Sequence, residues 1–149
     1  MPATTTTATA RRDADLAPRL RFAITRTARR MRQEAGSDLG PSQTAALATI
    51  ERHGPLSPSE LAQRERIKRP TATRILGHLE SAGLLERVRD PDDGRASILS
   101  VTGEGRSLLR RMRARKTAYL AHQISALEPD EVAALERAAD VLERMLDRS

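Results

Sequence analysis

The feature that most constrains the fold of this chain is a change of apolar periodicity near its middle. Before the change, apolar side chains recur at the helical spacing of three or four residues, and the clearest set is Ala72, Ile75, Leu76 and Leu79. After it, residues 84–89 and 96–101 read as two short strands separated by Asp93-Gly94, a pair common in hairpin turns. The pattern therefore predicts helices followed by a β-hairpin.

Helix-start signals divide the segment before the hairpin into short elements. Ser57, Pro58 and Glu60 fit the N-cap, first and third positions of a helix, which together make a capping box. Pro70 fits the first position of the next helix, and Gly83 follows its end. Two short helices joined by a tight turn and followed by a hairpin predict a winged helix-turn-helix.

Further helices are expected on both sides of this module. A disordered tail is expected over residues 1–12, followed by a helix that begins at Asp13 or Asp15 and ends at Gly36. Another helix opens at Gly40-Pro41, just before the two short ones. After the hairpin, Thr102 fits the N-cap of a long helix, and Pro129 starts a last one. The predicted fold class is mainly α with a small β-hairpin wing.

The charge of the chain points to a polyanionic partner. Lys and Arg number 26 against 20 Asp and Glu, which gives a net charge of +6 and a pI near 11.0. Much of the excess lies in residues 19–32 and 106–116, which contain no acid. These two segments are read either as solvated helix faces or as a source of electrostatic attraction to nucleic acid.

Composition also excludes several classes of protein. The chain has no cysteine, so disulfides, thiolate metal sites and thiol redox sensing are ruled out. The three histidines are isolated and no HExxH motif occurs, so we expect no enzyme, no metal and no cofactor. The apolar runs are too short to span a membrane and no secretory signal is seen, so a cytoplasmic location is expected. With Phe22 and Tyr119 as its only aromatic residues, the chain is expected to bury some apolar helix surface between subunits.

Four stretches together resemble the multiple antibiotic resistance regulator (MarR) family of bacterial transcription factors, over roughly residues 15–147. LSPSELA resembles the first helix of the family's helix-turn-helix, and RPTATRILGHLESAGL resembles its recognition helix. DPDDGRASILSVT resembles its wing signature, and LEPDEVAALERAADVL its closing helix. The capping box followed along the chain by the wing signature is the more specific part of the match.

The resemblance implies a homodimer in which the first and the last two helices pair. Residues 13–36 would then form an N-terminal dimerisation helix, 40–102 the winged helix-turn-helix DNA-binding domain and 103–149 the C-terminal dimerisation helices. The apolar residues expected at the dimer surface are Leu16, Leu20, Phe22, Leu127, Leu135, Leu142 and Leu146. The alternative for each of them is ordinary burial within one chain.

The expected partner is double-stranded DNA. A helix fits the major groove and reads bases from its N-terminal half, where Thr71, Thr73 and Arg74 lie. Phosphate contacts are expected from Ser57, Arg69, Arg87 and Arg89. The resemblance adds Arg95, which matches the family's wing arginine in the minor groove, and Asp93, which we expect to orient Arg95 through a charge-assisted hydrogen bond. Asp90 and Asp92 are interpreted as turn formers.

The function that the resemblance implies is sequence-specific regulation of transcription. We expect a homodimeric repressor that binds a pseudo-palindromic operator and is released by a small aromatic or phenolic effector. The candidate effector contacts are Phe22, Arg26 and His53, for which packing or surface exposure is the alternative. The alternative function is a winged-helix protein-interaction or architectural DNA-binding module without effector control. The residues name neither the operator nor the regulated genes, and they do not decide between repression and activation.

Overall fold

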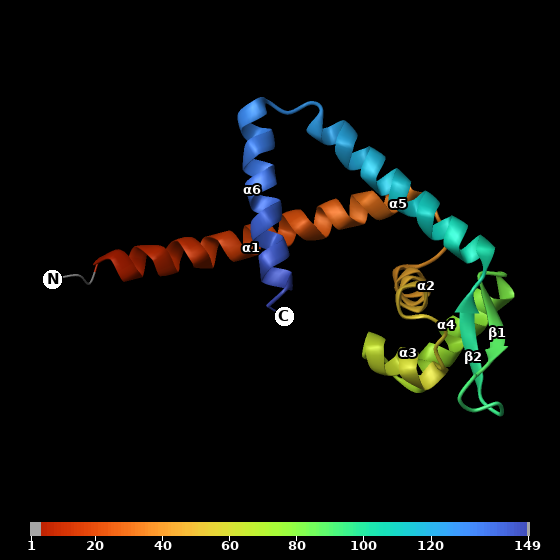
Figure 1. Cartoon of the computed structure of the whole chain (residues 1–149). Helices are drawn as coiled ribbons and strands as arrows, with labels where there is room; N and C mark the ends of the chain where they lie inside the picture. The colour runs from red at the N-terminus through yellow and green to blue at the C-terminus, as the bar shows by residue number, and fades with distance from the viewer. Residues whose placement is uncertain (1–3, 149) are drawn as a thin grey trace. The chain divides into compact units, whose positions relative to one another are not determined.

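The computed structural model describes residues 4–148 and, within them, shows a helical chain with one β-hairpin (Figure 1). The helices are α1 (Thr4–Ala35), α2 (Pro41–His53), α3 (Pro58–Glu65), α4 (Arg69–Ser81), α5 (Gly103–Ile124) and α6 (Pro129–Leu146). The strands β1 (Leu85–Arg89) and β2 (Ser97–Val101) pair antiparallel, with Leu85 opposite Val101 and Arg89 opposite Ser97. The predicted fold class and order of elements are confirmed.

Contacts between residues divide the chain into two compact units. The first, called the winged-helix unit, covers Ala35–Ala114 and holds α2, α3, α4, the hairpin and the first half of α5. The second, called the helical unit, consists of the described residues before Ala35 and after Ala114. The boundary therefore falls inside α5 and not at the expected position 103. The reason is that Gly105, Leu109 and Met112 on the first half of α5 are buried.

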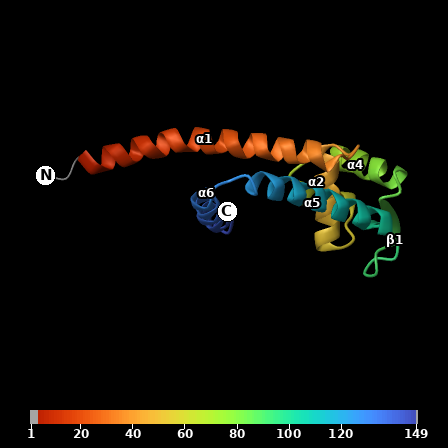
Figure 2. The same cartoon turned by 90° about the horizontal axis from the view of Figure 1, so that it is seen from above.

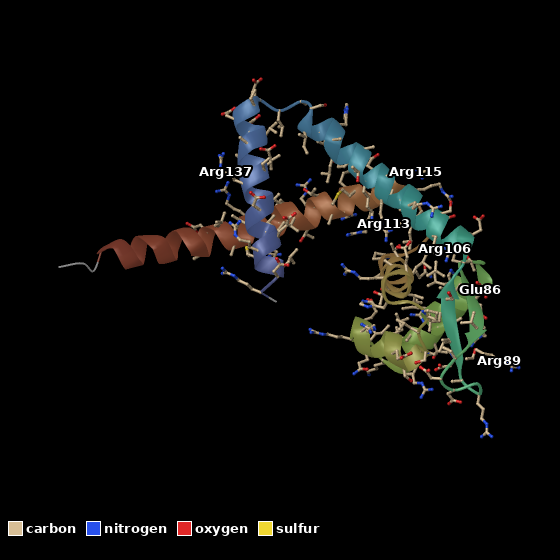
Figure 3. The ribbon with its side chains drawn as sticks, in the orientation of Figure 1. Glu86, Arg89, Arg106, Arg113, Arg115 and Arg137 are labelled. Carbon is tan, nitrogen blue, oxygen red and sulfur yellow. The ribbon has the colours of Figure 1, made fainter. Side chains whose placement is uncertain are left out.

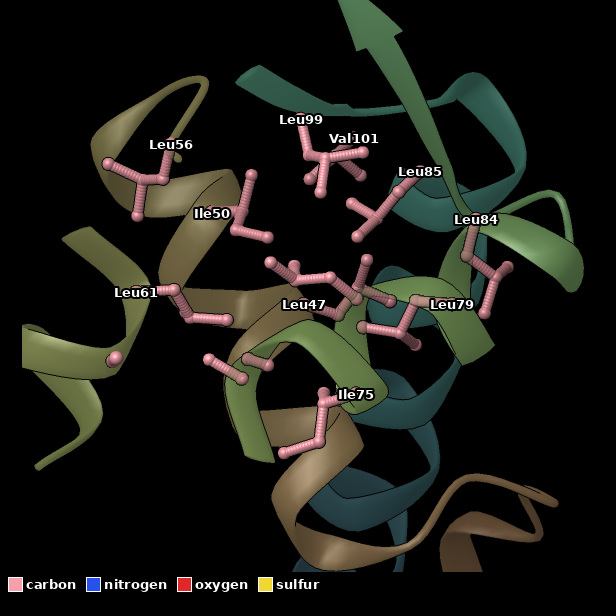
Figure 4. Close-up of a cluster of buried hydrophobic side chains, with 14 of the residues drawn as sticks. Leu47, Ile50, Leu56, Leu61, Ile75, Leu79, Leu84, Leu85, Leu99 and Val101 are labelled. Atoms are coloured by element: carbon pink, nitrogen blue, oxygen red, sulfur yellow. The ribbon is translucent and has the colours of Figure 1, made fainter. Parts of the chain in front are cut away.

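One apolar core holds the winged-helix unit together (Figure 4). Helices α2, α3 and α4 and strand β2 each contribute side chains that are at most 1% exposed. These are Leu47 and Ile50 from α2, Leu61 from α3, Leu79 from α4 and Leu99 from β2. Complete burial of such a side chain is worth about 1.5–3 kcal/mol. The backbone attaches the hairpin as well, because Leu56 N–H donates to Leu99 O at 3.0 Å and Leu99 N–H donates back to Leu56 O at 2.9 Å.

Capping side chains and glycines set the helix ends of the winged-helix unit. The capping box predicted for α3 is present, since Glu60 N–H donates to Ser57 Oγ at 3.2 Å and Ser57 N–H donates to the Glu60 carboxylate at 2.7 Å. Gly54 and Gly83 take positive φ angles of 85° and 72° where α2 and α4 end. The start of α3 and the end of α4 agree with the sequence prediction.

The N-terminal part of α1 differs from the expectation. The helix begins at Thr4 and not near Asp13, so most of the tail expected over residues 1–12 is helical, while residues 1–3 lie outside the described residues. Between Pro2 and Pro18 the sequence has neither glycine nor proline. Nothing in that segment therefore interrupts the backbone hydrogen bonding as the helix extends toward its N-terminus.

In the helical unit, no residue of the ranges 14–34 and 115–148 is buried. No residue of α6 is buried. In Figure 1 α6 crosses α1 in projection, but Figure 2 shows the two helices apart. Large apolar side chains on these helices are exposed, among them Leu16 at 55%, Phe22 at 58%, Leu135 at 48% and Leu146 at 74%. No helix within residues 4–148 is long and apolar enough to cross a membrane.

Candidate nucleic-acid interface

Helix α4 presents two faces of different chemistry. Its inner face consists of Ala72, Ile75, Leu76 and Leu79, none more than 6% exposed. Its outer face is polar, and the exposed side chains on it are Thr73, Arg74, His78 and Ser81. The inner face fixes the helix in the unit, so the outer face is free to meet a partner.

The first turns of α4 offer hydrogen-bond donors to that partner. Arg69 and Arg74 are exposed, and neither has an ion-pair partner among the described residues. The Thr73 hydroxyl donates to Arg69 O at 3.0 Å, which leaves its oxygen lone pairs for an outside donor. Thr71 is half-buried beside them. The structure thus brings these four predicted residues together on one helix.

Ser57 is largely committed to the start of α3. Its backbone N–H and its Oγ both bond to Glu60. The hydrogen bond from the Ser57 backbone, followed by the one from its side chain, lowers the pKa of Glu60 below its usual value. The donors of Ser57 are thus directed to the Glu60 carboxylate, and the phosphate contact expected of Ser57 stays a prediction.

The hairpin places its three arginines differently. Arg87 Nε pairs with Glu80 Oε1 at 2.9 Å, which connects β1 to α4. Arg89 is exposed and points away from the ribbon of the hairpin (Figure 3). Arg95 lies exposed in the loop between the strands. Arg89 and Arg95 are therefore the freer cations of the wing, and Arg87 has a structural partner.

Asp93 orients Arg95 through the backbone and not through the guanidinium. Its Oδ1 accepts from the backbone N–H of Arg95 at 3.1 Å. Asp90 acts similarly, since its Oδ1 accepts from the N–H of Asp92 at 2.9 Å. Both acids are thus turn formers, and the Arg95 guanidinium is left available for an outside contact.

The loop between the strands, residues 90–96, contains a turn at the Asp-Gly pair. Asp90 N–H donates to Ala96 O at 3.0 Å, and Ala96 N–H donates to Asp93 O at 2.9 Å. Asp93 and Gly94 are therefore the first two positions of a turn over 93–96, and not a two-residue hairpin turn. Arg95 takes the third position of this turn, at the tip of the wing.

Gln43 is a residue near the outer face of α4 that the sequence reasoning missed. Together with Arg74, Ile75, Gly77, His78 and Ser81 it lines a recess of about 320 Å³. Gly77 sits mid-helix, where glycine costs about 1 kcal/mol relative to alanine. The signal that could have revealed Gln43 is its position three residues after Gly40, where it accepts from Gly40 N–H at 2.9 Å as the second half of a capping arrangement.

The candidate effector residues are not gathered at one site. In the helical unit the Arg26 guanidinium lies 5.2 Å from the centre of the Phe22 ring. Arg26 also lines a recess of about 480 Å³ with Arg29, Arg30 and Tyr119. His53 belongs to the winged-helix unit and lines a separate recess of about 300 Å³ with Arg113, which is labelled in Figure 3.

Comparisons with known proteins agree with the geometry. The model of the MarR family matches residues 39–97, which span α2 to the start of β2. An HTH-type transcriptional regulator of Mycobacterium bovis is 34% identical over 138 residues, covering 92% of this chain and 96% of the relative. The HTH-type transcriptional repressor MdtR of Bacillus subtilis is 33% identical over 62% of this chain and 59% of that protein.

Solved structures lead to the same family. A crystal structure from Pseudomonas aeruginosa is similar with a TM-score of 0.80 and 35% sequence identity, covering 91% of this chain and 96% of that one. The similarity thus extends over both units and not only over the winged helix. The chain belongs to the MarR family of DNA-binding transcriptional regulators.

Proposed function

We propose that the protein is a sequence-specific repressor that binds a pseudo-palindromic operator as a homodimer. The observation that carries the proposal is the polar outer face of α4, which presents Arg74 without an ion-pair partner among the described residues. A helix with such a face fits the major groove, where an arginine bonds either a guanine edge or a phosphate. The wing presents Arg95 beside it, and an arginine suits a narrow minor groove.

Dimer formation is supported by the helical unit. Four of its side chains, Leu16, Phe22, Leu135 and Leu146, are between 48% and 74% exposed. Exposed apolar surface of this extent marks an association site. A second copy of the same chain would cover it through an isologous interface and would present two α4 helices to two half-sites.

The repressor assignment is supported by one relative. MdtR of Bacillus subtilis, which is similar over 62% of this chain, is named a transcriptional repressor. A dimer bound at a promoter represses by excluding the polymerase. In transcription from the operator-bearing promoter, we expect added protein to lower transcript yield; a rise would make it an activator.

Release by a small aromatic or phenolic acid is the proposed control. In the helical unit a carboxylate would pair with Arg26, while the ring of the ligand would lie near Phe22. Such a ligand releases DNA only if it binds the free dimer more tightly than the bound one. Salicylate is the probe: it should weaken operator binding in the wild type and have less effect in Arg26→Ala.

The central test is discrimination between DNA sequences. An operator is selected from random duplexes with the wild-type protein, and its affinity is compared with that of a scrambled duplex at one salt concentration. We expect tighter binding to the selected site by about 10³-fold or more, with half-sites about one helical turn apart. Equal affinities would reject the regulator and favour the architectural DNA-binding module.

A further inference from the structure

The recess beside Gly77 has a chemistry of its own. Its lining comes from two helices: Gln43 lies in the first turn of α2, and the other residues lie on α4. The lining contains no carboxylate. The nearest acid on α4, Glu80, pairs with Arg87 on β1. The recess therefore presents donors without a competing acid.

Gln43 is oriented by the helix that carries it. Its Oε1 accepts from the backbone N–H of Gly40 at 2.9 Å. The same amide group must then direct its Nε2 donors elsewhere, and no described residue accepts from them. Arg74 and His78 add a guanidinium and a ring N–H from exposed positions. Three donor groups thus border one recess.

Gly77 keeps the recess open. A Cβ built at Gly77 meets no atom within 4 Å, so the fold itself leaves room for a side chain. Alanine would also favour the helix more than glycine does. The Ser81 hydroxyl donates to Gly77 O at 2.8 Å and so forms part of the floor of the recess, not a further donor. The packing of the fold therefore does not require glycine at this position.

We propose that this recess seats one phosphate of the operator backbone in each half-site. Gln43 Nε2, Arg74 and His78 would donate to its oxygens, and Gly77 would let it approach the backbone of α4. Phosphate contacts of this kind set the register of a recognition helix on the duplex. The inference rests on the proposed function, because it requires that the outer face of α4 meets DNA.

Two substitutions test phosphate binding in the recess without disturbing the fold. In Gln43→Glu a carboxylate still accepts from Gly40 N–H, as Glu60 and Glu131 do for their own caps, but the donor becomes an anion. In Gly77→Ala a methyl group enters the recess. The matched controls are Gln123→Glu on α5, which makes the same charge change, and Gly103→Ala, whose Cβ also meets nothing within 4 Å.

Binding to the selected operator is measured against salt concentration for all five proteins. The loss of one phosphate contact lowers the salt slope by about one and the affinity at 0.1 M salt by roughly tenfold. We expect both losses for Gln43→Glu and for Gly77→Ala, and wild-type values for the two controls. Gly77→Ala should also melt about 2–4 °C higher than the wild type, because the helix gains an alanine.

A series of operator duplexes, each with a neutral methylphosphonate at a different backbone position, identifies the phosphate that binds in the recess. At the seated phosphate the wild type should lose affinity, whereas Gln43→Glu should gain it, since a repulsion is removed. The inference would be overturned if both variants bound the operator like the wild type. It would also be overturned if their loss of affinity depended on the identity of one base pair and on no single phosphate. The proposed function is tested separately, by comparing the affinity of the wild type for the selected duplex with its affinity for the scrambled duplex. Equal affinities there would reject the proposed function itself.

Discussion

The two units of the chain differ in how they satisfy their apolar residues. The winged-helix unit buries side chains such as Leu47 and Leu79 completely, at 0% exposure. In the helical unit, α6 has no buried residue, and its Leu135 and Leu146 remain 48% and 74% exposed. The winged-helix unit thus has an apolar core, whereas the described apolar side chains of α6 would be covered only in the proposed dimer.

The largest effect is expected when positive charges are placed on the exposed apolar face of α6. Replacing Leu135 and Leu146 together by lysine should convert the dimer into monomers. Each leucine buried in an interface contributes about 1.5–3 kcal/mol, and twofold symmetry counts both residues twice, so the loss is about 6 kcal/mol or more. Analytical ultracentrifugation over a range of concentrations measures it.

The matched control for this prediction is Asp140→Lys. It adds the same side chain to α6 at a position that helical geometry places about 120° or more from the two leucines. It should leave the dimer intact. A double leucine variant that still sediments as a dimer would show that the stripe on α6 is not part of the interface.

The next prediction concerns the close contact between the first turn of α5 and the rest of the winged-helix unit. A Cβ on Gly105 would lie 2.4 Å from Leu84 O and 2.7 Å from a Val101 methyl carbon. Gly105→Ala should therefore destabilise the winged-helix unit by about 1–3 kcal/mol through overpacking. Thermal melting measures the effect, and Gly103→Ala, with open space around its Cβ, is the control. Equal melting temperatures for the two variants would contradict the contact.

A smaller effect is expected from the tip of the wing. Arg95→Ala should lower the salt slope of operator binding by about one unit and weaken binding, while the dimer and its melting temperature stay unchanged. The reason is that the Arg95 guanidinium has no partner among the described residues, and Asp93 bonds only its backbone. Fluorescence anisotropy against salt concentration checks this. Unchanged binding would remove the wing from the interface.

The smallest predicted effect is the pH dependence of the cap of α3. The Ser57 hydrogen bonds lower the pKa of Glu60 in the folded state, so the cap stabilises the fold above the ordinary glutamate pKa of 4.5. This contribution disappears as the pH falls through the lowered value. Glu60→Gln does not titrate, so its stability deficit relative to the wild type should shrink on acidification below about pH 4.5. A deficit independent of pH would contradict this assignment.

Local signals in the sequence predicted the parts of the fold that local physics controls. The Ser57–Glu60 capping box, the end of α4 before Gly83 and the paired strands all depend on residues a few positions apart. The start of α1 was predicted less well. Asp13 looked like an N-cap, but a cap residue stops a helix only if the preceding residues favour another conformation.

The features that sequence reasoning missed depend on distant contacts. Gly105 reads as an ordinary glycine at a helix start, and only the position of Leu84 shows why a Cβ would not fit. Gln43 lies 34 positions before Gly77, so the recess that they share follows from the packing of α2 against α4. The hydrogen bond of Asp93 was predicted to involve Arg95, but the choice of the backbone donor depends on the geometry of the turn.

The division of α4 into an inner and an outer face has a consequence for evolution. The residues that secure the fold, such as Ala72 and Leu79, are separate from those that face outward, such as Arg74 and His78. Exposed substitutions usually change stability by no more than about 0.5 kcal/mol. With the operator contacts proposed above, duplicated copies of this gene could acquire new operators by mutating the outer face alone, without a compensating change in the core.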